Sequence, residues 1–394
     1  MTRPKPDPKL VTDESGWLMY HSVGRFPGQR QAIAAAMAGF TDSWYALDDK
    51  RWETAAQGRR RAQELWARLV GAVPAAVFAS ENVTVAFHQF IDSIPTARLA
   101  GRKVLIAEDC FPSLYFLLTG LAPHLGFRIE TVRAGSQATY TTDDDFIEAW
   151  DDEVALAMVN WVTSVASKRA DLARLVAHGR RMGSLVAVDI TQGVGVLPLD
   201  VTALDLDFAA GTSLKWLCGL PGAGFAYVAP RLLNTLEPRL RGWFSQLNPA
   251  SWVLDRFSLA PDARRFGHGT PSSLPYLGTL PGLEWVISHG VAEIEAHNRK
   301  LCHDLIDIAD AHGLQLASPR ADAERGGSVM IVLMSEATAE AARRKLLALG
   351  FVCDIRGNRM RWSPGAVTTS GAIELLNQAL GDVARELRLN DGAR

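Results

Sequence analysis

Short apolar runs with strand character alternate with helical segments through the first two thirds of the chain. Seven runs have the length of buried strands, and several are separated by segments whose apolar residues have helical spacing. This alternation predicts an α/β fold with a mostly parallel sheet covered by helices on both faces. Ligands of such sheets gather at the carboxyl ends of the strands, so a functional site is expected there. The predicted strands cover residues 75–80, 103–108, 128–132, 154–160, 184–189, 207–211 and 224–229, and the predicted helices 55–71, 82–94, 112–123 and 170–182.

The pattern changes towards the C-terminus. Residues 230–285 are rich in Trp, Pro and Gly and are expected to be irregular, and a compact α+β unit is predicted after them. We expect an N-terminal arm over 1–20, a large domain over 21–285 and a small C-terminal domain over 286–394. The small domain is predicted to contain helices at 289–312, 337–349 and 371–388 and strands at 328–334 and near 351–355.

The stretch DFAAGTSLKWLCGLPGAGF, residues 207–225, places Lys215 among small and apolar residues, with no acidic residue within seven positions on either side. Asp189 ends an earlier buried strand. A carboxylate at a strand end can keep a pyridine nitrogen protonated, and a lysine can form a Schiff base with an aldehyde. The pair predicts pyridoxal phosphate as the cofactor. A capping aspartate and a snorkelling surface lysine are the alternatives for the two residues taken singly.

This unit resembles the pyridoxal phosphate enzymes of fold type I, in the class V aminotransferase and cysteine desulfurase superfamily. Within that superfamily it is most similar to kynureninase, and the resemblance covers most of the chain. It implies a large pyridoxal phosphate-binding domain, a smaller C-terminal domain and a homodimer with shared active sites. The other segments that carry the resemblance are HSVG (21–24), ENVTVAFHQF (81–90), FPSLYF (111–116), RGWFSQ (241–246), GTPSSL (269–274) and FVCDIRGNRMRWSP (351–364).

Lys215 is the expected catalytic residue, and the resemblance places Arg361 where the family binds the substrate carboxylate. A guanidinium has a planar fork that matches a carboxylate, although a surface salt bridge is the alternative for this arginine. The resemblance also implies that the stretch 41–53 lies at the mouth of the pocket, where two aromatic side chains can stack on a substrate or simply pack. The expected substrate-binding residues are Ser22, Trp44, Tyr45 and Arg361.

The cofactor phosphate is expected at the start of the helix predicted over 82–94, where free N–H groups and the helix dipole favour a dianion. Phe111 can stack on the pyridine ring, and Ser213 can donate to the phosphate; ordinary packing and local turn contacts are the alternatives. Trp243 and Thr270 can complete the phosphate site, from their own chain or from a neighbouring subunit. The expected cofactor-binding residues are Val83, Thr84, Phe111, Asp189, Gln192, Ser213, Lys215, Trp243 and Thr270.

Three family positions differ in this chain. Leu214 stands where kynureninases carry a tyrosine before the lysine, Gln192 where they carry a histidine, and Leu114 where their Phe-Pro-Ser-Asp segment ends. Leucine can donate neither a proton nor a hydrogen bond. Loss of a general acid typically costs about 10²–10⁴-fold in rate, so hydrolysis of an aromatic ketone is disfavoured.

A thiolate leaves with little help from an acid, because thiols have a pKa of about 8.5. We therefore expect cleavage at Cβ of an α-amino acid, foremost C–S β-elimination from a cysteine S-conjugate in bacterial specialised metabolism. The first alternative is a kynureninase, which hydrolyses kynurenine to anthranilate and alanine. Decarboxylation with oxidative deamination, transamination and a catalytically silent scaffold of the same fold are the others.

Composition and charge exclude several other classes of protein and of binding site. The net charge of −2 and the lack of a basic stripe argue against a nucleic-acid partner. No run approaches 18 apolar residues, and the polar N-terminus lacks the apolar core of a signal peptide, so neither a membrane span nor export is expected. The histidines show no metal-binding spacing. The four cysteines are far apart, which favours reduced thiols in a cytoplasmic protein.

Overall fold

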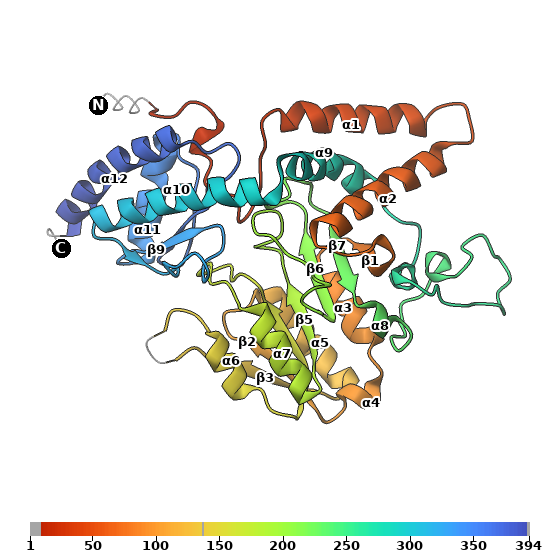
Figure 1. Cartoon of the computed structure of the whole chain (residues 1–394). Helices are drawn as coiled ribbons and strands as arrows, with labels where there is room; N and C mark the ends of the chain where they lie inside the picture. The colour runs from red at the N-terminus through yellow and green to blue at the C-terminus, as the bar shows by residue number, and fades with distance from the viewer. Residues whose placement is uncertain (1–8, 136–137, 392–394) are drawn as a thin grey trace.

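The computed structural model of the chain describes residues 9–135 and 138–391. The strands of its large sheet are β1 (Val77–Ser80), β2 (Lys103–Ala107), β3 (Arg128–Val132), β4 (Val154–Asn160), β5 (Leu185–Asp189), β6 (Phe208–Thr212) and β7 (Gly224–Val228). They lie in the order β1-β7-β6-β5-β4-β2-β3 (Figure 1). The strands from β6 to β3 run parallel, β7 is antiparallel to β6, and β1 is antiparallel to β7. The predicted mostly parallel sheet is confirmed.

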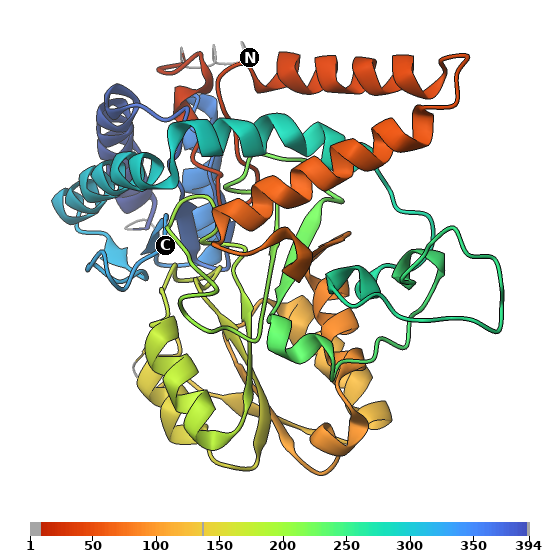
Figure 2. The same ribbon diagram turned by 45° about the vertical axis from the view of Figure 1, so that its right-hand side comes forward.

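The helices around this sheet are α1 (Gln29–Trp44), α2 (Arg51–Leu69), α3 (Val83–Ser93), α4 (Thr96–Leu99), α5 (Pro112–Leu125), α6 (Asp143–Ala149), α7 (Leu172–Met182), α8 (Pro230–Leu233) and α9 (Leu274–His289). The α3–α5 pair and the α6–α7 pair lie on opposite faces of the sheet (Figures 1 and 2). Helix α9 packs against α1 and α2. Every side chain of β5 and β6 is buried between these layers, which explains their unbroken apolar sequences.

The small C-terminal domain consists of α10 (Val291–Ala311), β8 (Gln315–Leu316), β9 (Val329–Val332), α11 (Glu336–Ala348), β10 (Asp354–Arg356), β11 (Arg359–Trp362) and α12 (Ser370–Asp391). Its strands form an antiparallel sheet in the order β10-β11-β9-β8, against which these helices pack (Figure 2). Phe351 and Trp362 lie in a core that is separate from that of the large sheet.

The N-terminal segment runs along this small domain. Trp17 pairs with Val352 and Met19 with Ser363, both in parallel bridges. Leu18 is buried in the core of the small domain. Residues 1–8 of the expected arm lie outside the described residues, and the division of the chain at residues 20 and 285 stays a prediction.

Five of the helices in the described residues were not predicted from the sequence: the short α4, α6 and α8, and the longer α1 and α9. Helix α1 carries no buried side chain, although Ile33, Met37, Phe40 and Trp44 follow helical spacing along it. The expected irregular structure over 230–285 is wrong at its end, since α9 begins at Leu274. Pro281 and Gly282 inside α9 mask its helical pattern. A Cβ atom on Gly282 would lie 2.4 Å from the carbonyl oxygen of Leu217, so the glycine lets α9 approach the turn after Lys215.

Among the described residues, no helix combines the length and the apolar character that crossing a lipid bilayer would require.

Candidate active site

A cavity of about 190 Å³ opens at the carboxyl ends of β4, β5 and β6. This is the edge of the sheet at which the sequence predicts a site. The residues that line the cavity are Asn82, Val83, Thr84, Phe111, Leu114, Asn160, Val162, Ser164, Asp189, Thr191, Gln192, Thr212, Leu214 and Lys215. Six of the predicted cofactor-binding residues therefore lie around one cavity: Val83, Thr84, Phe111, Asp189, Gln192 and Lys215.

The backbone around Lys215 is held by the N-terminal segment. The backbone N–H of Gly24 donates to the carbonyl oxygen of Leu214 at 2.9 Å. A Cβ atom on Gly24 would lie 1.8 Å from the carbonyl oxygen of Lys215, so only glycine fits this contact. The Lys215 Nζ atom lies 5.6 Å from the centroid of the Phe111 ring. Burial lowers the pKa of Lys215 to about 8, which makes part of this amine neutral near physiological pH.

Asp189 is 7% exposed at the end of β5. Its Oδ1 atom accepts the backbone N–H of Thr191 at 3.0 Å, and its Oδ2 atom accepts a hydrogen bond from Asn160 at 3.2 Å. Both donors are neutral, so burial outweighs them and raises the pKa of Asp189. A cationic group brought into the cavity would stabilise this carboxylate.

The start of α3 forms another wall of the cavity. The side chain of Asn82 caps the helix by accepting the backbone N–H of Val85 at 3.0 Å. Val83 and Thr84 follow this cap and line the cavity. Their backbone N–H groups lie in the first turn of α3 and have no acceptor within the helix. An anion is stabilised at such a position.

Thr212 lines the cavity, whereas Ser213 does not. Side chains alternate in direction along a strand, and Ser213 points away from the cavity to lie beside Gly219. Ser213 is fully buried, and its hydroxyl has no hydrogen-bond partner among the described residues. Thr212 and Asn160 were missed from the sequence. Their positions at the last residue of a buried strand were the available signal.

Arg361 lies on β11 and is 4% exposed, so it is not a surface salt bridge. Its Nε atom donates to Asp354 Oδ1 at 2.7 Å, and its Nη2 atom donates to Asp354 Oδ2. Its Nη1 atom donates to the carbonyl oxygen of Ser164, a residue of the cavity wall, at 3.0 Å. A guanidinium has five N–H donors, so one remains on Nη1 and one on Nη2. Together these two donors suit the two oxygens of a carboxylate.

The other predicted residues lie elsewhere on this chain. Trp44 packs on Phe40 and Trp52 at the end of α1, and Tyr45 is 75% exposed beside it, near the α1–α2 connection (Figure 1). Ser22 is half-buried and does not line the cavity. Trp243 belongs to a separate hollow of about 540 Å³, and Thr270 is exposed. Any contact of these residues with a substrate or cofactor stays a prediction.

Two of the three residues that differ from the kynureninase pattern are apolar and line the cavity. Leu114 at the start of α5 and Leu214 before the lysine both line it. The third, Gln192, donates to the carbonyl oxygen of His21 at 3.0 Å and accepts from the indole of Trp216 at 3.4 Å. Gln192 therefore links the Asp189 loop to the N-terminal segment.

Comparison with known proteins agrees with this geometry. The model of the family described as "Aminotransferase class-V" matches residues 31–348. The chain belongs to this family. The class V membership within the fold type I pyridoxal phosphate enzymes that the sequence predicts is confirmed.

This class V protein is similar to kynureninase of Bacillus anthracis, with 31% identity over 77% of the chain and 72% of the relative. It is also similar to an uncharacterized aminotransferase of Bacillus subtilis, with 26% identity over 90% of each. Its fold matches that of a cystine C–S lyase solved in complex with cysteine persulfide, with a TM-score of 0.82, 18% identity and coverage of 94% of this chain and 97% of the other.

Proposed function

We propose that this class V enzyme uses pyridoxal phosphate to cleave at Cβ of an α-amino acid, foremost as a C–S β-lyase acting on a cysteine S-conjugate. The observation that carries the proposal is the position of Leu114 and Leu214 in the same cavity as Lys215 and Asp189. The cavity combines a base and a ring-binding carboxylate with an apolar wall. Departure of a thiolate suits such a wall, since it does not depend on a strong acid.

The residues present fit pyridoxal phosphate. Asp189 is a desolvated carboxylate without a cationic hydrogen-bond donor among its contacts, and it would hold the pyridine nitrogen in its protonated form. The start of α3 would hold the phosphate, and Phe111 would cover the ring. When bound, the cofactor supplies an electron sink for the negative charge that develops at the substrate Cα.

Each protein group then has a definite task. The free Nη1 and Nη2 donors of Arg361 bind the substrate carboxylate and orient the bond from Cα to hydrogen. Lys215 would hold the cofactor aldehyde and, as a neutral amine, would take the proton from Cα. Its pKa of about 8 suits a general base near neutral pH. Leu114 and Leu214 keep water from this wall.

The overall reaction balances as elimination followed by hydrolysis. A cysteine S-conjugate and one water give a thiol, pyruvate and ammonia. The Cβ–S bond breaks, its electron pair leaves with sulfur, and the proton lost from Cα is returned to the products.

Kynureninase is the second candidate, because the Bacillus anthracis relative at 31% identity carries that name. Leu214 argues against it, since the side chain offers no hydroxyl where the family pattern has a tyrosine. No particular contact favours decarboxylation, transamination or a silent scaffold.

We also propose a cytoplasmic homodimer with shared sites. Trp243, Thr270, Trp252 and Leu254 are exposed on the segment between α8 and α9, and Tyr45 is exposed near the end of α1. A second copy would cover such apolar side chains. Light scattering after gel filtration tests this, and a monomer at micromolar concentration would contradict it.

The function is tested with purified protein loaded with pyridoxal phosphate. We expect pyruvate, ammonia and a thiol from at least one of a panel of S-substituted cysteines. Kynurenine and 3-hydroxykynurenine are the comparison substrates, and Lys215→Ala is the control protein. Release of anthranilate with no pyruvate from the cysteine panel would replace the lyase proposal with kynureninase.

A further inference from the structure

His21 occupies a buried junction between the N-terminal segment and the small domain. Its Nε2 atom lies 2.9 Å from Asp354 Oδ1, and its Nδ1 atom lies 2.6 Å from the Ser363 hydroxyl. The carbonyl oxygen of the same residue accepts the Gln192 side chain at 3.0 Å. One histidine thus contacts the small-domain sheet through its ring and the cofactor loop through its backbone.

The protonation of His21 follows from its partners. Burial lowers its pKa to about 4, so the ring is neutral at physiological pH. A carboxylate can only accept, so the proton belongs on Nε2, which contacts Asp354 Oδ1 at 2.9 Å without the alignment of a full hydrogen bond, and Nδ1 accepts from the Ser363 hydroxyl. Ser363 in turn lies 2.6 Å from the Ser328 hydroxyl. Asp354 therefore sets the tautomer, and the two serine hydroxyls, which can donate or accept, adapt to it.

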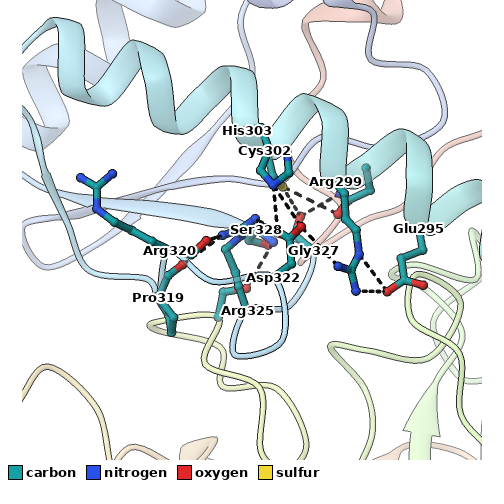
Figure 3. A network of polar contacts seen from close by, with 12 residues as sticks. Glu295, Arg299, Cys302, His303, Pro319, Arg320, Asp322, Arg325, Gly327 and Ser328 are labelled. Carbon is teal, nitrogen blue, oxygen red and sulfur yellow. Dashed lines mark hydrogen bonds and ion pairs between the residues drawn. The ribbon is translucent and has the colours of Figure 1, made fainter.

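Ser328 is itself held in place by the loop before β9. Arg325 in this loop is 2% exposed; it donates to Asp322 at 2.5 Å and to the carbonyl oxygen of Pro319 at 3.2 Å (Figure 3). The backbone N–H of Ser328 donates to the Ser167 hydroxyl of the large domain at 3.2 Å. Ser328, which forms one end of this series of contacts, is therefore held in place by the loop before β9 and by the large domain.

The other end of this chain of contacts is Arg361. Asp354 Oδ1 is shared between His21 Nε2 and Arg361 Nε, while Oδ2 accepts from Arg361 Nη2. Burial alone would raise the pKa of Asp354, but His21 and Arg361 outweigh it and hold that pKa well below its usual range. Asp354 is thus a fixed anion that occupies one edge of the guanidinium. The edge that remains is the one with the two free donors.

We propose that His21 is a positioning residue for the substrate carboxylate, because it fixes Asp354 and Asp354 orients Arg361. This inference rests on the proposed function, in which Arg361 binds an α-amino acid. If the inference holds, His21 affects the binding affinity of ligands that carry a carboxylate and leaves the affinity of amines without a carboxylate unchanged. A purely structural histidine would affect both kinds of ligand or neither.

The test compares two ligands that differ only by the carboxylate. The first is α-methylalanine, which has no α-proton to lose, and the second is isopropylamine. Binding to the cofactor-loaded protein is measured by calorimetry for wild type, His21→Leu and His21→Gln. We expect His21→Leu to weaken the binding of α-methylalanine by roughly tenfold and to leave the binding of isopropylamine unchanged, since the Asp354 carboxylate loses its polar contact with Nε2. Glutamine can place an N–H near the position of Nε2, so His21→Gln should recover most of the affinity.

Two controls keep the outcomes separate. His178→Gln alters another buried histidine, whose Nε2 atom lies 2.9 Å from the carbonyl oxygen of Trp150, and should leave both affinities unchanged. If His21→Leu does not fold, Ser363→Ala, which releases the Nδ1 contact, should show a smaller loss of the same selectivity. Equal losses of affinity for both ligands, or no loss, in a folded His21 variant would overturn the role proposed for His21 but not the task proposed for Arg361. A wild-type protein with no preference for the carboxylate would overturn the proposed task of Arg361 as well.

Discussion

Asp354 and Arg361 face each other across the β10–β11 hairpin, as paired residues of its antiparallel register, and the carboxylate occupies the Nε edge of the guanidinium at 2.7 Å. This pairing neutralises a buried arginine without using all of its donors. It also fixes the direction in which the remaining donors point, because the hairpin holds both backbones.

Replacement of Arg361 by lysine should therefore damage substrate binding more than folding. Lysine keeps the charge near Asp354 but lacks the planar fork. We expect KM for the amino acid substrate to rise by about 10- to 100-fold, with a smaller change in kcat. Steady-state kinetics on the best substrate of the cysteine panel would measure this. An unchanged KM would show that the carboxylate binds elsewhere.

Lys215 should make the stability of the cofactor-free protein depend on pH. Its pKa is about 8 in the folded state and about 10.5 when unfolded, so the unfolded chain binds more protons between these values. The contribution of Lys215 to the free energy of unfolding should then rise with pH across this window. Relative to wild type, Lys215→Met should be more stable at pH 7, on the order of 3 kcal/mol, and should lose most of that advantage by pH 10. Denaturant unfolding at the two pH values measures this difference in the free energy of unfolding. A difference that is the same at both pH values would contradict a lowered pKa for the buried Lys215 amine.

A hydroxyl introduced at position 214 tests the apolar wall. Leu214→Tyr places a phenol where the cavity has only an alkyl group. We expect hydrolysis of kynurenine to increase by at least about tenfold, since a positioned acid typically contributes 10²–10⁴-fold. Leu214→Phe is the matched control for size. An equal gain with phenylalanine would assign the effect to shape rather than to proton donation.

Gly24 should be intolerant of any side chain. A Cβ atom there would lie 1.8 Å from the carbonyl oxygen of Lys215, so Gly24→Ala must displace the backbone that carries the Lys215 amine. We expect a lower melting temperature and a loss of activity larger than the stability change explains. Gly39 in α1 is the control, because a Cβ atom there meets nothing within 4 Å. Gly39→Ala should be neutral or stabilising by about 0.5–1 kcal/mol.

Removal of the Asp189 carboxylate should weaken the binding of pyridoxal phosphate. Asp189→Asn keeps the size and can still accept the backbone N–H of Thr191, but its amide nitrogen can neither accept from Asn160 nor stabilise a protonated pyridine nitrogen. We expect the dissociation constant of pyridoxal phosphate to rise by at least about tenfold, measured by fluorescence titration of the cofactor-free protein. An unchanged constant would mean that the ring nitrogen contacts another group.

The inner strands of the large sheet were predictable because they are covered on both faces. Burial of this kind requires unbroken apolar sequences such as those of β4 and β5, and these are visible in one dimension. Helix α1 was missed although its apolar residues follow helical spacing, and none of its side chains is buried on this chain. Helix α9 was hidden because its prolines and glycines serve contacts with other segments, such as the turn after Lys215.

The sequence by itself determined the fold class, the two ionisable groups Lys215 and Asp189, and the apolar substitutions at 114 and 214, because each depends on residue type at a strand or helix end. Only the tertiary structure decided that Thr212 rather than Ser213 faces the cavity. It alone also joined His21 to Asp354 and Ser363, more than three hundred positions away in the chain. Contacts of this kind depend on how separate elements pack, and local sequence carries no record of that packing.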